Sequence, residues 1–409
     1  MTISRRQFLT AAGAGVTAPV WLRLGGLVED AAFAAPVAPS RLLLTIFLGG
    51  GNDGLNTVAP YLDPQYQRIR PNLALRESEV LPIGGGLGLH SSLASIHERW
   101  TKGQVAVVQR VGYAKPNFSH FASANVWDTG SPVNQFASGW LGRYLDRTDN
   151  RSRGAVRALA VADSMPLTIS GDRVSGVAAR TLGDFALLGS GPEADLRRQA
   201  LVDFGAGGRD ASMRSTVVDW QQRMLQAVTA IGQLSSSSSQ TNAAETIVTA
   251  FAGGLGTEVG YLTLGSYDTH TDQRWRHAAN LKMLDDTVKA FFNAAEAKGV
   301  ASRAAVLVVS EFGRRGPENA AGGTDHGAGG PVFLIGPTVK GGVYGDRADL
   351  SRLDDGNVPA AFDLRSVYAS VLEQHLDAAA GPILGGTFGQ LPLFTTAKVA
   401  PATPKRARR

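Results

Sequence analysis

The chain of 409 residues contains no cysteine. This absence excludes disulfide bonds, thiolate metal sites, iron–sulfur clusters and cysteine nucleophiles. Any metal must therefore be held by Asp, Glu, His or backbone oxygen. Histidine is also scarce, with seven residues in the whole chain, so the position of each one is informative.

The usual nucleotide-binding loops are missing as well. The first glycine-rich turn, GGGNDGLNTVAP, has neither the G-x-G-x-x-G spacing nor a Gly-Lys-Ser/Thr ending. These are the patterns that bind dinucleotides and nucleotide phosphates. A flavin or nicotinamide enzyme is therefore the least favoured class.

The body of the chain has no excess of charge. The formal net charge is +5, but the segment Met1–Ala34 contributes one positive charge and the final KRARR contributes four. The remainder is near neutral, so charge gives no argument for a nucleic-acid partner. We expect residues 397–409 to form a basic, disordered tail.

The N-terminal segment, residues 1–35, is typical of a twin-arginine export signal. It has Arg5 and Arg6, then a weakly apolar Ala/Gly-rich stretch that ends in AFAA. A membrane anchor is the alternative, but Arg23 interrupts the stretch, and an uninterrupted span needs about 20 apolar residues. We expect export by the twin-arginine translocase and cleavage near Ala34 or Ala35. No stable membrane span then remains, and the protein works in the periplasm, cell wall or extracellular space.

Residues 36–396 are predicted to form a single α/β domain. Apolar runs of strand length alternate with segments of helical spacing, such as Asn280–Lys298. This pattern predicts a doubly wound, mostly parallel central sheet flanked by helices. Ligands of such sheets gather at the carboxyl ends of the strands. The predicted strands are Arg41–Leu48, Gln104–Val111, Val259–Gly265, Ala304–Ser310 and Pro331–Gly336.

Acidic residues and histidines follow two of these strands directly. Asp53 follows the first strand on a glycine-rich turn; Asn-Asp-Gly is also an ordinary turn sequence, so a turn and a ligand role both stay open. Asp268, His270 and Asp272 alternate after the third strand. Alternate side chains of an extended segment share one face, which favours a site over an exposed polar strand end.

A third group follows the fourth strand, in SEFGRRGPENAAGGTDHG. Asp325 and His326 are adjacent, and adjacent side chains bind one ion only where the backbone bends sharply, which the flanking glycines permit. Arg314, or its neighbour Arg315, could clamp an anion. Three strand ends thus bring acidic residues and histidines to one edge, namely Asp53, Asp268, His270, Glu311, Asp325 and His326.

A helix is predicted to begin close to Ser119, in GYAKPNFSHFASANVWDTG. The free amides and positive dipole of a helix start favour an anion near this serine. A simple N-cap is the common alternative. The pattern alone leaves both roles open for Ser119. If Ser119 is only a cap, His120 is the fallback nucleophile or proton donor.

The segments GGGNDGLNTV, FSHFASANVW, YDTHTDQ, SEFGRR and GGTDHG together resemble a family of twin-arginine-exported proteins known as domain of unknown function 1501. Their order also resembles that of the alkaline phosphatase and sulfatase superfamily. That resemblance implies an alkaline-phosphatase-like fold with two metal ions and a Ser, Thr or modified Cys nucleophile that cleaves or moves phosphate or sulfate esters.

By this resemblance Asp53, Asp325 and His326 would hold one metal, Asp268 and His270 would help to hold the other, and Ser119 would be the nucleophile. The superfamily places a late histidine on the second metal. Here only His375 follows His326, in a segment typical of a packed helix. Glu311 or Asp272 could substitute, or one metal could suffice. Asp and His ligands without sulfur favour Zn or Mn, with Mg or Ca as the alternatives.

Two functions follow from these features. The first is an exported metal-dependent hydrolase or transferase acting on a small phosphate or sulfate ester, with Ser119, His120 and Arg314 as catalytic residues. The second is a non-catalytic envelope binding or assembly protein that keeps the fold. The combination of Ser119 with Asp53, Asp325 and His326 favours the enzyme.

Overall fold

The computed structural model describes residues 39–149, 154, 156–174, 176–180, 196 and 242–395. All of them belong to one compact unit, Val37–Arg409. The predicted export signal and basic tail lie outside the described residues. No helix in the described ranges combines the length and the apolar character needed to cross a membrane.

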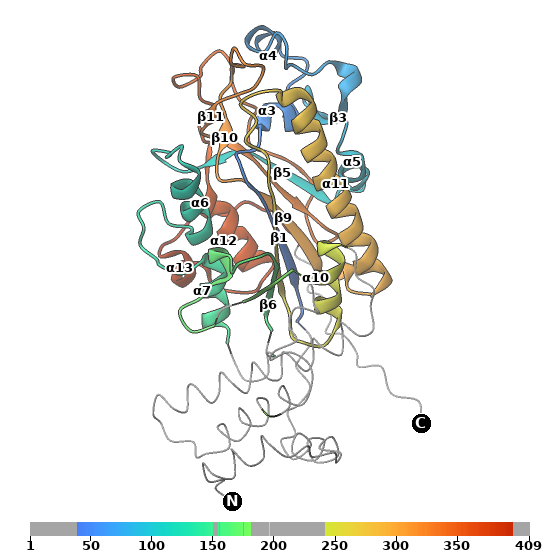
Figure 1. The fold of residues 1–409 in the computed structure, drawn as a ribbon, viewed down its shortest axis with the longest axis vertical. Coiled ribbons are helices and arrows are strands. Elements are labelled where there is room, and N and C mark those ends of the chain that lie inside the picture. The colour runs from blue at the N-terminus through green and yellow to red at the C-terminus, as the bar shows by residue number, and fades with distance from the viewer. Residues whose placement is uncertain are drawn as a thin grey trace, which may run out of the picture. The chain divides into compact units, whose positions relative to one another are not determined.

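A large central sheet organises this unit (Figure 1). Its strands lie in the order β13-β5-β12-β9-β1-β8-β6-β7, with β14 beside β5. The five predicted strands are all present, within one residue or two of their expected ends. The strands are β1 Leu42–Leu48, β5 Val105–Gly112, β6 Ala158–Val161, β7 Val177–Ala179, β8 Val259–Leu264, β9 Ala304–Val309, β12 Gly330–Ile335, β13 Gly342–Tyr344 and β14 Phe362–Asp363.

The sheet is mixed and mostly parallel, as predicted. Strand β1 runs parallel to β8 and β9, and β6 runs parallel to β7 and β8. Only β12 runs antiparallel to its neighbours β5 and β9 among the described strands of this sheet. The chain leaves β9 and re-enters through β12 with no crossover helix between them, so it returns from the edge that it left.

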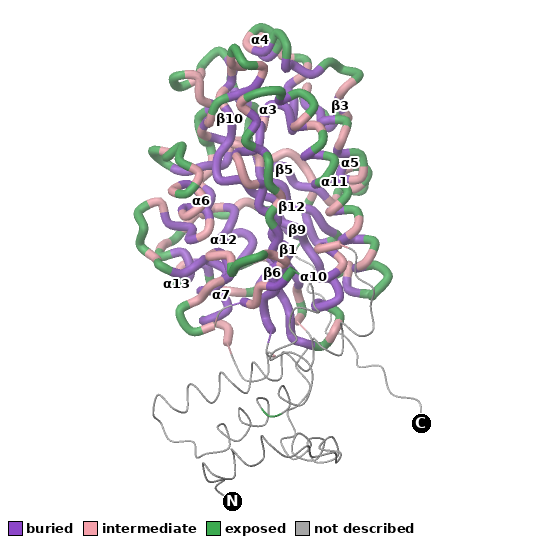
Figure 2. Tube along the Cα trace, in the orientation of Figure 1, coloured by how far each residue is buried: buried purple, intermediate pink, exposed green. Residues whose placement is uncertain are grey.

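Helices cover both faces of the sheet (Figures 1 and 2). Because side chains alternate along a strand, Leu43 packs into one core while Leu42 and Leu44 pack into the other. The first core also takes in α6 His120–Thr129, α7 Trp140–Arg147, α12 Leu364–Gln374 and α13 Ala380–Leu384. The second takes in α5 Ala94–Thr101, α10 Ala243–Ala252 and α11 Gln273–Ala297.

Smaller elements lie beside the carboxyl edge of the sheet. A three-stranded sheet pairs β2 Val58–Ala59 and β3 Val80–Gly84 with β4 Leu87–His90. Helix α3 Gly54–Thr57 precedes β2 in the chain, and helix α4 Pro64–Ile69 lies between β2 and β3. A short ladder pairs β10 Gly313–Arg314 with β11 His326–Gly327.

Helix α11 begins seven residues before the predicted Asn280. Its N-cap residue, Asp272, has a φ of 50°, so the extended segment after β8 ends in a sharp left-handed turn there. The prediction placed Asp272 on the same face as Asp268 and His270. The turn takes Asp272 out of that alternation.

Candidate functional site

The loops that carry the predicted site residues meet at one edge of the sheet. Strands β1, β8 and β9 end there, and β12 begins there. The loop after β1 is compact because Gly51, at φ +79°, has no side chain; a Cβ on it would lie 2.4 Å from the ring of Phe312. The β10–β11 ladder sets Arg314 directly opposite His326. Local pairing thus places side chains from distant segments of the chain next to one another.

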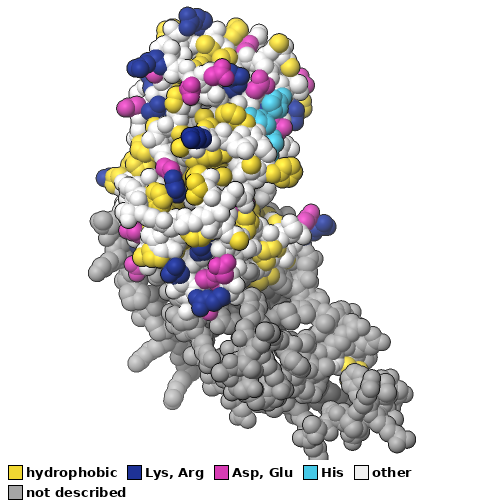
Figure 3. All heavy atoms as spheres, turned by 90° about the vertical axis from the view of Figure 1, so that its left-hand side faces the viewer, with side chains coloured by type: hydrophobic (Ala, Val, Ile, Leu, Met, Phe, Trp, Pro, Cys, Tyr) yellow, Lys and Arg dark blue, Asp and Glu magenta, His cyan; other side chains and the backbone are white. Residues whose placement is uncertain are grey.

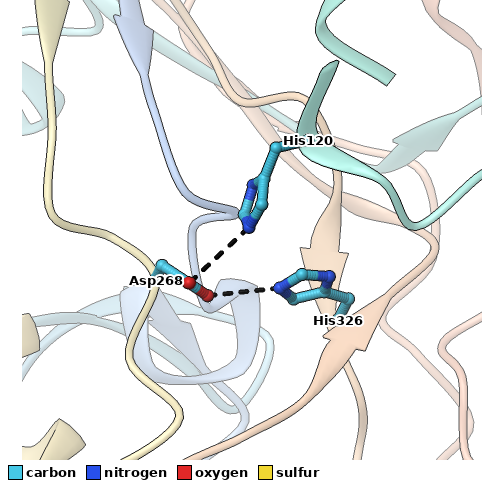
Figure 4. A group of neighbouring side chains, drawn as sticks. All are labelled: His120, Asp268 and His326. Atoms are coloured by element: carbon cyan, nitrogen blue, oxygen red, sulfur yellow. Dashed lines mark hydrogen bonds and ion pairs between the residues drawn. The ribbon is translucent and has the colours of Figure 1, made fainter. Parts of the chain in front are cut away.

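Three imidazoles converge on Asp268 at this edge, and Figure 4 shows two of them, those of His120 and His326, beside its carboxylate. Its carboxylate lies 3.1 Å from Nε2 of His270, 3.2 Å from Nε2 of His326 and 3.6 Å from Nε2 of His120. The Nε2 atoms of His270 and His326 are 3.0 Å apart. We call His120, Asp268, His270 and His326 the histidine cluster.

Each imidazole of the cluster directs its Nδ1 at an oxygen that can only accept a hydrogen bond. These pairs are His120 with Glu311 (2.9 Å), His270 with Asp325 (3.0 Å) and His326 with the carbonyl of Phe118 (2.7 Å). Nδ1 must therefore carry the proton in each neutral ring, and the Nε2 lone pair is left facing Asp268. Three lone pairs and one carboxylate thus point at one another.

This donor set fits a divalent metal ion. Lone pairs and carboxylate oxygens repel one another unless a proton or a cation lies among them. Ligand atoms about 2.1 Å from a tetrahedral ion are about 3.4 Å apart, close to the distances from Asp268 to the three Nε2 atoms and between the Nε2 atoms of His270 and His326. Outer oxygens that hold the Nδ1–H groups are the usual support of histidine ligands.

The protonation states of the cluster also suit a cation. Burial raises the pKa of Asp268, but the hydrogen bond and the charge of Arg314, together with the neighbouring imidazoles, outweigh it and leave the pKa at about 2. Burial lowers the pKa of His326. A hydrogen bond from Asn319 lowers the pKa of Asp325. At neutral pH these groups are a carboxylate, a neutral imidazole and a carboxylate, the forms that bind metals.

Arg314 differs from its predicted role as an anion clamp. Its guanidinium is fully buried and donates to the carbonyls of Gly50, Gly51, Tyr267 and Thr324, and to Asp268 at 2.6 Å. These bonds join the loops after β1 and β8. Arg314 therefore orients Asp268 and has no face open to a substrate.

Asp53 lies in a buried ion pair and outside the histidine cluster. Arg70 donates to both of its oxygens, at 2.6 and 2.9 Å, and Gln273 donates to one of them. Burial raises the pKa of Asp53, but the charge and hydrogen bonds of Arg70 outweigh it and lower the pKa overall. The cation that balances Asp53 in the structure is a guanidinium, which differs from the predicted metal.

Glu311 and Asp325 stand behind the cluster, where the prediction made them direct ligands. Glu311 is buried, accepts from the amides of Gly50 and Gly51, and holds Nδ1 of His120. Asp325 holds Nδ1 of His270 in the same way. Each carboxylate fixes the orientation and tautomer of an imidazole.

Ser119 is exposed at the first turn of α6, as predicted for a helix-start serine. Its side chain makes no capping hydrogen bond. It lies between Phe118, whose carbonyl binds His326, and His120, whose ring lies 4.5 Å from that of His326. Ser119 therefore lies at the margin of the cluster, and its hydroxyl does not cap the helix.

His375 plays no part in the site. It is buried at the end of α12, donates from Nε2 to the carbonyl of Leu42 at 3.0 Å, and stacks on Phe394. This agrees with the packing role expected from its helical segment.

An open hollow of about 340 Å³ adjoins the cluster. Figure 3 shows histidine side chains gathered on the surface among acidic and basic ones. His270 and His326 form one part of the lining, and Arg315 forms another. The full lining is Phe118, His270, Arg315, Asp325, His326, Asp355 and Asn357.

Two contributors to the site went unpredicted. Asn319 donates to Asp325 and to the carbonyl of His270, and its own oxygen accepts from the amides of Ala321 and Gly323. It fixes the glycine-rich loop on the cluster. Phe118 contributes a backbone carbonyl. Neither carries a sequence signal, because a backbone oxygen has no residue identity and Asn319 resembles any loop asparagine.

Solved structures similar to this chain include a sulfatase, a lipoteichoic acid synthase and a pyrophosphatase/phosphodiesterase, each at low identity. A sulfatase from Pseudoalteromonas sp., PsFucS1, is 11% identical with a TM-score of 0.37, over 91% of this chain and 73% of its own. The lipoteichoic acid synthase LtaP from Listeria monocytogenes is 10% identical with a TM-score of 0.35, over 86% and 75%. Murine ectonucleotide pyrophosphatase/phosphodiesterase 5 is 7% identical with a TM-score of 0.38, over 83% and 96%. No curated protein matches the chain.

The family model described as "Protein of unknown function (DUF1501)" matches residues 40–376. This range includes every residue of the histidine cluster and the loops that support it. The chain belongs to the DUF1501 family.

Proposed function

We propose that this protein is an exported, metal-dependent hydrolase or transferase of a phosphate or sulfate ester, with one divalent ion in the histidine cluster. The observation that carries the proposal is that Nδ1 of His120, His270 and His326 each lies within hydrogen-bond distance of an accepting oxygen, while the three Nε2 atoms face Asp268. Nitrogen and oxygen donors without sulfur favour Zn or Mn, and Mg or Ca are the alternatives. Such an ion supplies positive charge to ester oxygens and activates an oxygen nucleophile.

The residues around the cluster keep it in place. Arg314 holds Asp268, Glu311 holds His120, and Asn319 holds Asp325, which holds His270. Such outer partners keep ligands in their productive orientation. The ester group binds in the adjoining hollow, next to His270 and His326.

If the reaction passes through a covalent intermediate, Ser119 is the nucleophile. Its Oγ forms a bond to phosphorus or sulfur while the bond to the leaving alcohol oxygen breaks. The hydroxyl proton passes to solvent, which the exposed site admits, and the alcohol takes a proton from solvent. Water or a second alcohol then attacks the serine ester, breaks its bond to Oγ and restores the hydroxyl.

The experiment is a panel of chromogenic phosphate and sulfate esters tested with the exported protein and Asp268→Asn. This variant keeps the shape of residue 268 and removes its charge. We expect turnover of at least one ester by the wild type and a loss of about 100-fold or more in kcat/KM in the variant. Absence of turnover in metal-loaded wild type would favour a non-catalytic binding or assembly role in the envelope.

A further inference from the structure

The hollow beside the histidine cluster has an unusual balance of charge. Among the described residues that line it, Arg315 is the only Lys or Arg, and Asp325 and Asp355 are the carboxylates. Asp268 lies deeper and is paired with Arg314 at 2.6 Å, so that pair adds no net charge. The lining by itself therefore carries one net negative charge.

Arg315 is held so that part of its guanidinium stays open to the hollow. Its Nη2 donates to the carbonyl of Asp355, and the side chain is 37% exposed. It lies against Gly356, where a Cβ would come within 2.6 Å of Nη2. Gly356 has a φ of 77° and Asp355 a φ of 45°, so this tight turn both admits and orients the guanidinium.

We propose that the hollow selects a singly charged tetrahedral ester, a sulfate monoester or a phosphodiester, with Arg315 as the residue that binds its outer oxygens. The inference rests on the proposed function, because it counts one divalent ion in the cluster. That ion brings the net charge of the lining from minus one to plus one. A monoanion neutralises it, whereas the dianion of a phosphate monoester leaves an uncompensated negative charge beside Asp325 and Asp355.

Neighbouring charges strengthen this preference. Glu311 stands behind His120, buried, and adds a further negative charge near the cluster. Asp53, a buried carboxylate outside the cluster, is paired with Arg70, so that pair adds no net charge. Asp355 is 94% exposed, so its effect is screened by solvent, but it lies 3.6 Å from Arg315 and offsets part of that charge.

The test is calorimetric binding of two ligands of similar shape that cannot turn over, benzenesulfonate and phenylphosphonate, to the zinc-loaded full chain in mildly alkaline buffer. The sulfonate carries one negative charge and the phosphonate two. We expect the sulfonate to bind about tenfold more tightly. Arg315→Met should lose about tenfold in sulfonate affinity, while Arg68→Met, the same change at an exposed site outside the hollow, should lose none.

Asp355→Asn makes the opposite change, because it removes one negative charge from the lining. This variant should bind phenylphosphonate more tightly than the wild type does, so the ratio of benzenesulfonate affinity to phenylphosphonate affinity should fall. Equal or tighter phosphonate binding by the wild type, or unchanged sulfonate binding by Arg315→Met, would overturn the inference.

Turnover then separates the two monoanions and the two proposals. Faster hydrolysis of p-nitrophenyl sulfate identifies a sulfate ester, and faster hydrolysis of bis(p-nitrophenyl) phosphate identifies a phosphodiester. Hydrolysis with a preference for p-nitrophenyl phosphate would keep the proposed function and refute this inference. Selective sulfonate binding with no turnover of any ester would support the charge preference of the hollow and refute the proposed enzymatic function.

Discussion

Two histidines near opposite ends of β1 show how position decides the role of the same side chain. The side chain of His270 is 41% exposed, with Nδ1 on a carboxylate and Nε2 in the cluster. His375 is buried, bound to a backbone carbonyl and stacked on an aromatic ring. Only the first has a lone pair directed at other ligands. Sequence reasoning separated these two because one lies in a polar loop and the other in a helix.

The pair makes a matched test of metal binding. His270→Ala should weaken metal affinity by at least about tenfold and leave stability nearly unchanged, because the side chain is exposed. His375→Ala should keep the metal and lose about 1–3 kcal/mol of unfolding free energy through a lost buried bond and lost packing. Competition with a chromogenic chelator and urea unfolding measure the two effects. Equal metal affinity in both variants would count against the cluster.

Buried histidines also predict how stability depends on pH. Burial lowers the pKa of His277 and His375 to about 4, against an ordinary value of 6.5. Both are neutral in the fold, and the unfolded chain binds more protons between these values, so stability falls as the pH drops below 6.5. The loss from pH 7 to pH 5 is about 2 kcal/mol per histidine.

Urea unfolding at the two pH values checks this, with His375→Gln as the comparison. The variant should be less stable at pH 7 but lose less on acidification than the wild type. An equal loss in both proteins would show that His375 does not titrate in this way.

At the scale of elements, the residue before α6, Ser119, could act as a helix cap or as a nucleophile, and one substitution distinguishes the two roles. Ser119 makes no capping bond, and its own amide donates to Asn117 at 2.8 Å. Ser119→Ala should therefore cost less than the ~1 kcal/mol of a lost cap. If Ser119 is the nucleophile, the variant should also lose ester turnover while it keeps its metal. Full activity in this variant would remove the covalent route, and His120→Ala in the same assay tests the fallback residue.

The link between α3, α4 and α11 depends on the buried pair Asp53–Arg70. Arg70→Met leaves Asp53 charged and buried, and should cost about 3–5 kcal/mol. Adding Asp53→Asn removes that charge and should restore part of the loss, which a double-mutant cycle measures. The account expects Asp53→Asn alone to keep its metal. Metal loss in that variant would return Asp53 to the ligand role that the sequence predicted.

Sequence patterns predicted the strands and the edge of the site, but they did not predict how side chains pair across it. Apolar runs mark β1, β5, β8 and β9 because a buried strand must be apolar over its whole length. The alternation of Asp268 and His270 likewise brought both to one site. Arg314 and Arg315 are indistinguishable as sequence, and only the β10–β11 ladder buries the first and leaves the second in the hollow. Asp53 is paired with Arg70, a residue 17 positions away whose approach no local pattern encodes, and its predicted ligand role stays a prediction.

At the scale of the whole molecule, export and metal loading are linked by the proposed function. The twin-arginine route carries folded proteins, so a metal-bound protein could form before export. Replacing Arg5 and Arg6 by Lys should leave the precursor in the cytoplasm, as measured by fractionation and the size of the chain. Normal export of that variant would refute the twin-arginine assignment, whatever the site does.

The central claim is that the protein binds one metal ion per chain. The described residues contain one histidine cluster, and Asp53 is already paired with Arg70. Elemental analysis of purified exported protein tests this most directly. The account predicts one divalent ion per chain, lost in the double variant His270→Ala, His326→Ala. Absence of any ion, under conditions in which a known zinc enzyme keeps its own, or an equal ion content in the double variant, would contradict it.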